Sequence, residues 1–177
     1  MKEPTSKWII RYKMEIRVIK QEEDIKTYYQ LLHKAITEEA QFFRVSPTDI
    51  VGETFPTEDT FDSFTLGAFD ENDDLLGTVG FKRESILKLR HKGLIFRMYV
   101  APEAKGLGLG RKLLQAAVER AKQGEGLKQI VLTLIADNHR AKNLYLSEGF
   151  EVFSFEKNAI RMSEELFVDE NAMVKYL

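Results

Sequence analysis

The spacing of apolar side chains at the start of the chain predicts a strand followed by a long helix. Residues 14–20 alternate between apolar and polar side chains, which is typical of a half-buried strand. Over residues 22–44 apolar side chains recur at steps of three and four, which predicts an amphipathic helix with one buried stripe. Residues 1–13 are expected to be an N-terminal extension of a single domain that covers residues 14–177.

Three strand-like runs follow, over residues 64–69, 75–84 and 93–100. They are rich in apolar and β-branched side chains, and the polar breaks between them have only the length of hairpin loops. Parallel neighbours would need a crossover of about a dozen residues or more, so these three strands are predicted to form an antiparallel meander.

The next part of the chain predicts a parallel crossover. A glycine-rich turn over residues 105–110 opens a helix that ends near residue 122. The nearly unbroken apolar run over residues 127–135 is expected to be a strand buried on both faces. A strand, helix and strand of this length form a right-handed parallel crossover.

The last elements complete a mixed sheet. A short helix is predicted over residues 138–148, capped by Asp137 or Asn138, and residues 150–156 and 172–177 are predicted to pair antiparallel. The predicted fold class is α/β in the broad α+β sense. It has a mostly antiparallel central sheet of roughly six to seven strands, one parallel crossover between the fourth and fifth strands, and helices on both faces.

Composition removes several classes of function. The chain has 177 residues and no cysteine, which excludes disulfides, thiolate metal sites and a thiol nucleophile. Lys and Arg total 26 and Asp and Glu total 28. The chain therefore has no excess of positive charge of the kind that indicates binding to nucleic acid or to an anionic membrane. Without an apolar run of about 18 residues or a signal-peptide pattern, we expect a cytoplasmic protein with no membrane partner.

The strongest chemical signal is the turn in which Gly106, Gly108 and Gly110 alternate between a strand and a helix. Without side chains the backbone can curl tightly and bring several N–H groups close together. The helix that follows adds unsatisfied donors and a partial positive charge, which together favour a bound phosphate or pyrophosphate. The alternative is a flexible turn that merely begins a core helix.

Two common phosphate-binding motifs do not fit this turn. The pattern G-x-G-x-x-G would need a glycine where Arg111 stands, and no glycine pair is followed by the Lys-Ser or Lys-Thr of a P-loop. Positive charge nevertheless gathers here, because residues 82–112 contain nine Lys or Arg against two Glu. A focused field for a polyanionic ligand explains this coincidence, and a solvated charged face is the simpler alternative.

Two sequence blocks resemble the GCN5-related N-acetyltransferase (GNAT) superfamily. The family's acyl-CoA loop reads R/Q-x-x-G-x-G/A after a strand that often ends Tyr-Val-x-Pro. Here Tyr99-Val100-Ala101-Pro102 precedes Lys105-Gly106-Leu107-Gly108-Leu109-Gly110. The second block, N-x-x-A-x-x-L-Y-x-x-x-G-F, is matched from Asn138 to Phe150. The resemblance covers residues 14–177.

The resemblance implies acetyl-CoA as co-substrate. Main-chain groups of Met98 and Val100 would pair with the pantetheine arm, and residues 105–111 would hold the pyrophosphate. Asn138 would contact the pantetheine, and Lys142 would reach a phosphate. The implied cofactor-binding residues are Met98, Tyr99, Val100, Lys105, Gly106, Leu107, Gly108, Leu109, Gly110, Arg111, Asn138 and Lys142. One departure is Lys105, because Arg or Gln is commoner there and Lys lacks the planar fork of Arg.

The implied reaction is direct attack on the thioester by a primary amine of a small molecule or peptide, in a ternary complex. The lack of cysteine agrees with this, since no thiol acyl-enzyme can form. Tyr145 is implied as the acid that protonates the leaving thiolate, and the alternative is a core aromatic with a satisfied hydroxyl. The backbone N–H of Val100 is the candidate oxyanion donor.

The general base is not assignable from the sequence. Many relatives have a carboxylate on the strand before the loop, but residues 94–99 contain no Asp or Glu. Glu38, Glu39, Glu84 or a chain of water molecules remain as alternatives, and each of these carboxylates is more often a surface group. The three histidines are isolated in sequence, so no metal is expected.

The acceptor and the oligomeric state are left open. Residues 38–74 contain eleven Asp or Glu and one Arg, which suggests a cationic acceptor, although a solvated acidic loop is the favoured interpretation. The missing strand carboxylate favours a rival, a catalytically silent acyl-CoA-binding or regulatory module. A domain that binds another nucleotide is disfavoured by the motif spacing. Dimers are common in the family, so a homodimer with contacts through the late strands is compatible with the resemblance.

Overall fold

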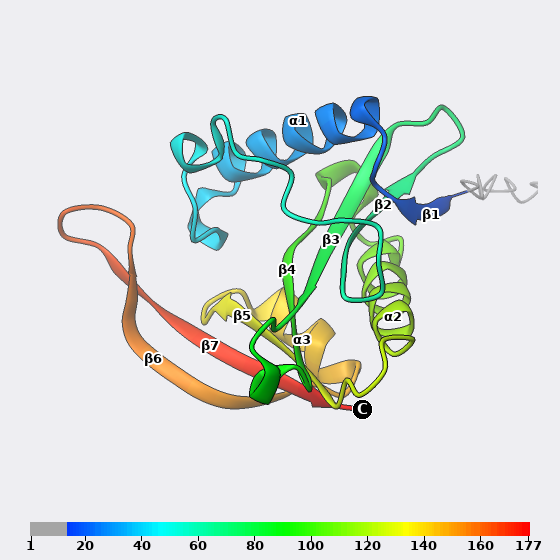
Figure 1. The fold of residues 1–177 in the computed structure, drawn as a ribbon. Coiled ribbons are helices and arrows are strands. Elements are labelled where there is room, and N and C mark those ends of the chain that lie inside the picture. Colours follow the sequence, from blue (N-terminus) through cyan, green and yellow to red (C-terminus); the bar gives the residue numbers. More distant parts are fainter. Residues whose placement is uncertain (1–13) are drawn as a thin grey trace, which may run out of the picture.

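A seven-stranded mixed sheet runs through the molecule in the order β1-β2-β3-β4-β5-β7-β6 (Figure 1). The structure is a computed structural model that describes residues 14–177, and the expected N-terminal extension over residues 1–13 lies outside the described residues. The strands are β1 (Glu15–Val18), β2 (Ser63–Phe69), β3 (Leu75–Arg83), β4 (Lys92–Val100), β5 (Gln129–Ile135), β6 (Glu151–Arg161) and β7 (Phe167–Tyr176).

Three helices pack on this sheet, namely α1 (Glu22–Glu38), α2 (Leu109–Ala121) and α3 (His139–Ser147). One core cluster joins α1 to the sheet through Tyr28, Leu32 and Ile36, and a second joins α2 and α3 to the opposite face through residues such as Leu113 and Tyr145. Helices therefore cover both faces, as the sequence predicts. Among the described helices, none combines the length and the apolar character that crossing a membrane requires.

The strand pairing confirms the predicted meander and crossover. Strands β2, β3 and β4 pair antiparallel in sequence order, and α2 connects β4 to its parallel neighbour β5. The parallel pairing is short, because it joins only Lys92–Leu94 to Gln129–Val131. Beyond Leu94 the two central strands part, and the edge of β4 that faces β5 is left without a partner strand.

A β-bulge interrupts β4 where the strands part. Phe96 lies opposite Gly80 and Tyr99 lies opposite Thr78, so two residues of β4, Arg97 and Met98, occupy the space of one residue on β3. Arg97 has φ +48°, a left-handed conformation that is costly for a residue with a Cβ. A bulge of this kind re-aims the strand and its side chains.

Four predicted elements differ from those in the structure, and two of them, β6 and β7, are longer than the predicted residues 150–156 and 172–177. The first helix ends at Glu38 instead of residue 44, and a short 3₁₀ turn, η1 (Ala40–Phe42), follows it. Its last turn has no basic residue, whereas Glu38 and Glu39 place negative charge at the negative end of the helix dipole. Strand β5 was expected to be buried on both faces, but its alternate residues are only half-buried, because α1 does not extend over them.

Candidate functional site

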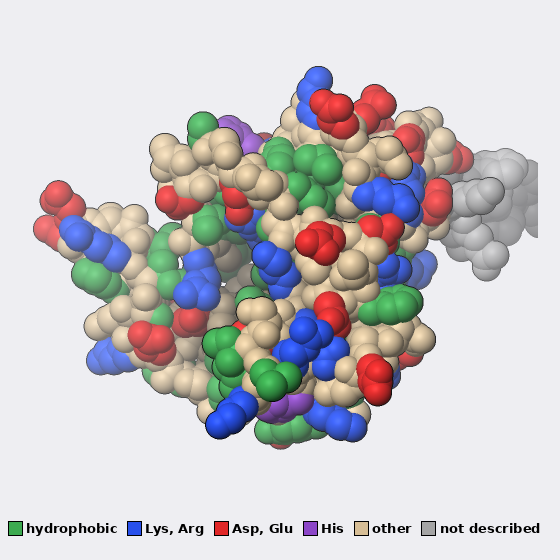
Figure 2. All heavy atoms as spheres, viewed as in Figure 1, with side chains coloured by type: hydrophobic (Ala, Val, Ile, Leu, Met, Phe, Trp, Pro, Cys, Tyr) green, Lys and Arg blue, Asp and Glu red, His purple; other side chains and the backbone are tan. Residues whose placement is uncertain are grey.

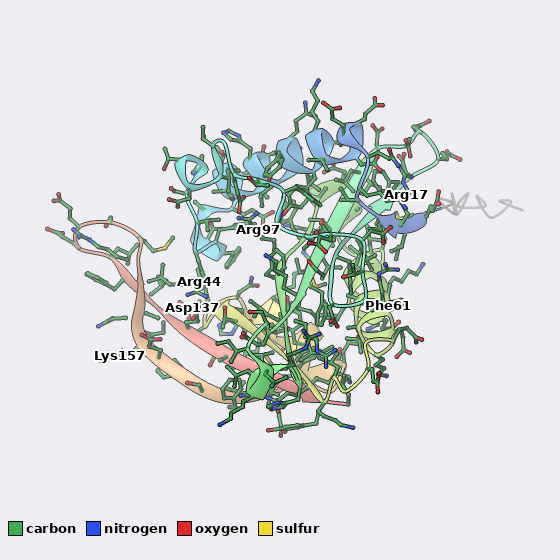
Figure 3. All side chains as sticks on the ribbon, in the orientation of Figure 1. Arg17, Arg44, Phe61, Arg97, Asp137 and Lys157 are labelled. Carbon is green, nitrogen blue, oxygen red and sulfur yellow. The ribbon has the colours of Figure 1, made fainter. Side chains whose placement is uncertain are left out.

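A cavity of about 640 Å³ opens where β4 and β5 part. Its walls are the end of β4, the loop before α2, the start of α3, and η1. A hollow separates the β6–β7 hairpin from the rest of the molecule (Figure 2), and Asp137, which lines the cavity, lies beside that hollow in the matching view (Figure 3). The lining residues are Glu39, Phe42, Phe43, Met98–Val100, Ala104–Gly106, Gly108–Arg111, Asp137–Ala141, Leu144 and Tyr145.

The glycine loop presents a row of unpartnered main-chain donors to this cavity. From Gly106 to Arg111, none of the six amide N–H groups donates a hydrogen bond within the described residues, and the first amide to do so is that of Lys112, which donates to Gly108 O at 3.2 Å. The last of these amides belong to the first turn of α2, where helix geometry leaves N–H groups free. Such a group of donors at a positive helix end can hold an anion.

Only two of the three glycines are needed for the loop conformation. Gly106 has φ +84° and Gly108 has φ +74°, in the left-handed region that favours glycine, and no atom lies within 4 Å of a Cβ built on either. Gly110 already lies inside α2, and its Cβ would meet Leu144 at an ordinary 3.4 Å. The sequence interpretation, in which all three glycines allow a tight curl, is therefore correct for two of them.

The free edge of β4 presents main-chain groups to the same cavity. The amide of Ala101 donates to Leu76 O of β3 at 2.8 Å, so it points away from β5. Because successive amides of a strand point to opposite sides, the N–H of Val100 faces the gap between β4 and β5. An extended chain lying in this gap can therefore bond to β4 as an added strand.

Lys105, at the start of the loop, does not present a free charge. Its ammonium group is bonded to the carboxylate of Glu39, the residue that follows α1. The hydroxyl of Tyr99 donates to the same carboxylate, Oε1, at 3.3 Å. Burial raises the pKa of Tyr99 above its ordinary value, and the negative charge of Glu39 raises it further. The loop cation is thus balanced by a carboxylate of the protein itself.

Tyr145 lies on the α3 side of the cavity and is buried, with 7% of its surface exposed. Its hydroxyl is 3.6 Å from Met98 Sδ, a weak acceptor. Burial raises the pKa of Tyr145 to about 12, because the phenolate would have to form without water around it. The hydroxyl therefore keeps its proton at neutral pH and points toward β4.

The bulge in β4 is fixed by a half-buried ion pair. The guanidinium of Arg97 binds both carboxylate oxygens of Glu53, at 2.8 and 2.9 Å, and donates to the hydroxyl of Tyr28 at 3.4 Å. Burial opposes the charge of Arg97, but its bonds to Glu53 and Tyr28 outweigh this and raise its pKa. Two bonds to one carboxylate restrict the orientation of the side chain, and we attribute the stability of the left-handed bulge to them.

Most of the residues predicted for the site come together here, and two do not. Leu107 and Lys142 are absent from the cavity walls, whereas the other predicted residues line it. Asn138, not Asp137, caps α3, because its Oδ1 accepts the amide of Ala141 at 3.2 Å. Arg111 reaches the loop end, but its Nε is 2.8 Å from the carboxylate of Glu148.

The three carboxylates that the sequence offers as a general base differ in their position relative to the cavity. Glu39 lines the cavity, and Glu38 and Glu84 do not. Most of the acidic residues in the segment 38–74 are engaged elsewhere. Ion pairs hold Glu53, Asp59, Asp62 and Asp73, and turn or cap hydrogen bonds hold Asp49 and Asp70.

Sequence reasoning missed Asp137 and the aromatic pair Phe42 and Phe43, although Asp137 directly precedes the second family block.

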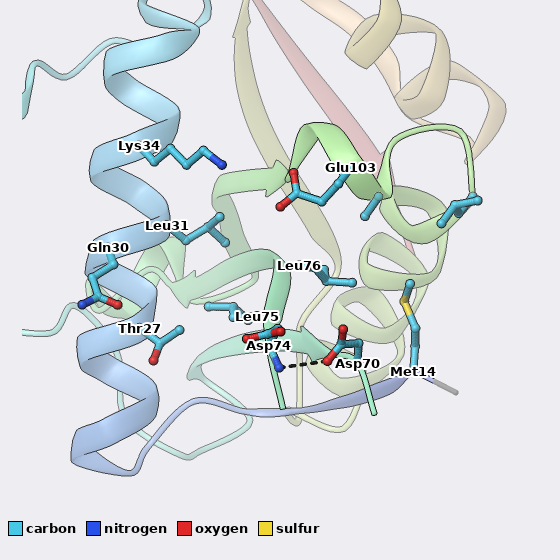
Figure 4. A pocket seen from close by; sticks show the side chains of 12 residues that line it. Met14, Thr27, Gln30, Leu31, Lys34, Asp70, Asp74, Leu75, Leu76 and Glu103 are labelled. Atoms are coloured by element: carbon cyan, nitrogen blue, oxygen red, sulfur yellow. Dashed lines mark hydrogen bonds between the residues drawn. The ribbon is translucent and has the colours of Figure 1, made fainter. Parts of the chain in front are cut away.

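A second cavity, of about 450 Å³, lies between α1 and the turn that joins β2 to β3 (Figure 4). Leu107 lines this cavity from the loop. Of its three acidic residues, Asp70 is committed to the turn, because its Oδ1 accepts the amides of Asn72 at 2.8 Å and Asp74 at 3.0 Å. Within residues 14–177, no cluster of three or more His, Asp or Glu side chains is arranged to hold a metal ion.

Comparison with known proteins gives three findings. The model of the acetyltransferase (GNAT) family matches residues 26–150. Mycothiol acetyltransferase of Kocuria rhizophila is 44% identical over 59 residues, which cover 33% of this chain and 19% of that protein. The enzyme of the same name from Renibacterium salmoninarum is 37% identical over 87 residues, 48% of this chain and 25% of that protein. The matched part thus spans a quarter or less of these curated relatives.

Solved structures with the same fold cover nearly the whole chain. A GNAT-family acetyltransferase from Streptococcus pneumoniae has a TM-score of 0.77 at 22% identity, over 93% of this chain and 100% of that one. The protein yncA from Salmonella typhimurium, in a structure with its cofactor acetyl-CoA, has a TM-score of 0.73 at 21% identity, over 93% and 94%. At these identities the likeness establishes the fold.

Proposed function

Because the chain belongs to the acetyltransferase (GNAT) family, we propose that it transfers an acetyl group from acetyl-CoA to a primary amine of a small molecule or peptide. The observation that carries this proposal is the row of free amides from Gly106 to Arg111. It lies in the same cavity as the open edge of β4 and the hydroxyl of Tyr145. One extended ligand with a pyrophosphate at one end and a thioester at the other satisfies all three.

The cavity suits acetyl-CoA in its polar groups. Its pyrophosphate would accept hydrogen bonds from the amides of the glycine loop, which have no other partner among residues 14–177. The pantetheine arm would lie along β4 and bond to main-chain groups of Met98 and Val100. Asn138 would meet it from the start of α3, since only its Oδ1 is used by the helix cap.

The proposed chemistry is a single displacement in a ternary complex. The amine nitrogen attacks the thioester carbonyl carbon, a C–N bond forms, and the C–S bond breaks with its electron pair moving to sulfur. The amide of Val100 faces the cavity and would stabilise the oxyanion. Tyr145, protonated at neutral pH because of its raised pKa, would give its proton to the departing thiolate.

A silent acyl-CoA-binding module is the second candidate. It is favoured by one observation: the bulge of β4 carries Arg97, bound to Glu53, and the strand has no carboxylate. Such a module would bind CoA and would not use it.

Two measurements on the full chain separate the candidates. Calorimetry with CoA, ATP and NAD tests which nucleotide ligand the cavity binds. We expect it to bind CoA selectively. Release of CoA thiol from acetyl-CoA is then measured with a panel of alkyl, aryl and peptide amines. Amine-dependent release supports the transferase, and tight CoA binding with no release above the amine-free rate would favour the silent module. Failure to bind CoA would contradict both.

A further inference from the structure

We propose that Asp137 is the catalytic residue that accepts a proton from the amine, a role that rests on the proposed acetyl transfer. Asp137 lies two residues after the end of β5 and lines the cavity together with Tyr145 and the end of β4. The sequence offers no base on β4, and Asp137 would supply the missing carboxylate from the turn that follows β5 across the gap.

Among residues 14–177, only two carboxylates line the cavity, and they differ in their partners. Glu39 is bonded to Lys105 and accepts the hydroxyl of Tyr99, so its charge is already balanced. The carboxylate of Asp137 has no hydrogen bond or ion pair with any residue from 14 to 177. Asp137 is exposed to solvent, so its unpaired carboxylate is available to an incoming ammonium group.

The backbone around Asp137 holds it in a fixed turn. The amide of Ala136 donates to Asp169 O of β7 at 2.8 Å, and the amide of Asn138 donates to Ile135 O at 2.9 Å. Asn138 performs the capping of α3, which leaves the side chain of Asp137 without a structural duty. The backbone of Asp137 is therefore held by its neighbours, and its side chain remains free for chemistry.

Asp137 lies beside the β6–β7 hairpin, because the amide of the preceding Ala136 bonds to β7, and Figure 3 labels Arg97 on the β4 side. The other charged residues that line the cavity are Glu39, Lys105, Arg111, His139 and Arg140. Phe42 and Phe43 supply an apolar wall for the body of the amine.

Two side chains, Asp137 and Tyr145, account for every proton transferred in this reaction. The bound ammonium gives one proton to the carboxylate of Asp137, and the free amine attacks the thioester. As the C–S bond breaks, the thiolate takes the proton of Tyr145, and the phenolate recovers the second proton that nitrogen loses as the amide forms. Asp137 then releases its proton to water, so the products are an amide, CoA thiol and one proton.

The test is Asp137→Asn, which keeps the shape of the side chain and removes its basicity. At neutral pH the kcat/KM for an alkylamine that the wild type uses should fall about 100-fold, within the range of acid–base catalysis. The affinity for CoA, measured by calorimetry, should stay within about twofold of wild type. Asp169→Asn is the control, because Asp169 lies on β7 outside the cavity lining, and asparagine keeps the Oδ1 that accepts the amide of Asn158 at 2.8 Å.

The pH profile distinguishes a base from a merely structural residue. In the variant only amine that is already uncharged can react, so kcat/KM should rise about tenfold per pH unit toward the pKa of the amine, near 10.4 for a lysine-like group. The deficit in kcat/KM of the variant relative to wild type should therefore shrink about tenfold per pH unit. A pH-independent loss, or no loss, would overturn the role of Asp137 and leave the transferase proposal intact. Absence of amine-dependent thiol release by the wild type would overturn both.

Discussion

Lys105 and Glu39 show how one residue pair can set the strength of anion binding. The ammonium that the loop offers to a pyrophosphate is held by the carboxylate of Glu39, so a bound anion and Glu39 compete for the same cation. Glu39→Gln should therefore tighten CoA binding by about two- to fivefold, the scale of a partly exposed ion pair. Calorimetry at low salt measures this, and weaker binding by the variant would show that Glu39 supports the ligand instead.

The position and the protonation state of Tyr145 both suit the proposed role of a general acid. Its buried hydroxyl lies 3.6 Å from Met98 Sδ and keeps its proton because burial raises its pKa to about 12. Tyr145→Phe should lower kcat about 100-fold and change the affinity for CoA less than twofold. Stopped assays of thiol release and calorimetry provide the two values. If both fall together, Tyr145 is a packing residue of the core.

The two family blocks identify Tyr145, Asn138 and the glycine loop from the sequence, because backbone and packing requirements fix those residue types at those positions. The same reasoning could not find Asp137. A carboxylate that makes no bond leaves no local pattern, and Asp137 and Asn138 are equally good caps on sequence alone. Which of the two is free depends on the turn after β5, which only the structure provides.

The loop between β4 and α2 is the element in which conformation and binding are most closely joined. Gly108 has φ +74° and open space around its missing Cβ, so an alanine there meets strain without a clash. Gly108→Ala should cost about 1 kcal/mol of stability and weaken CoA binding about tenfold, because relaxation of the backbone moves the free amides.

Gly126 offers a matched control at the other end of α2. It has φ +77°, and its Cβ would meet Arg83 at an ordinary 3.5 Å. Gly126→Ala should lose similar stability with no effect on CoA binding. Equal binding losses in both variants would mean that the loop acts only through global stability.

The elements themselves were predictable where periodicity is strong and less so where it is weak. The meander and α2 have clear apolar patterns, and their bounds agree with the structure to within a residue or so. Strands β6 and β7 extend well beyond the predicted pair, to Glu151–Arg161 and Phe167–Tyr176. Most of β6 is exposed, so no buried face imposes an alternating pattern on its sequence.

At the scale of the whole molecule, buried tyrosines predict loss of stability in alkaline solution. Burial raises the pKa of Tyr28, Tyr99 and Tyr145 above their unfolded value of about 10. The contribution of these buried hydroxyls to the free energy of unfolding is complete below about pH 10. It is lost as the pH rises toward their pKa values in the folded protein. For Tyr145, with a pKa of about 12, this amounts to about 3 kcal/mol.

Urea unfolding at a series of pH values from 8 to about 12 measures this effect. The free energy of unfolding should be level up to about pH 10 and should then fall. In Tyr145→Phe the fall should be smaller, since one of the three phenols is gone. An unfolding free energy that does not change across this range would contradict the burial of these hydroxyls.

The most direct test of the central claim is a crystal structure of the full chain with bound CoA. We expect the pyrophosphate to accept hydrogen bonds from the amides of Gly106 to Arg111 and the CoA sulfur to lie within hydrogen-bond distance of the Tyr145 hydroxyl. A CoA molecule bound elsewhere, with those amides still free of the phosphates, would contradict it.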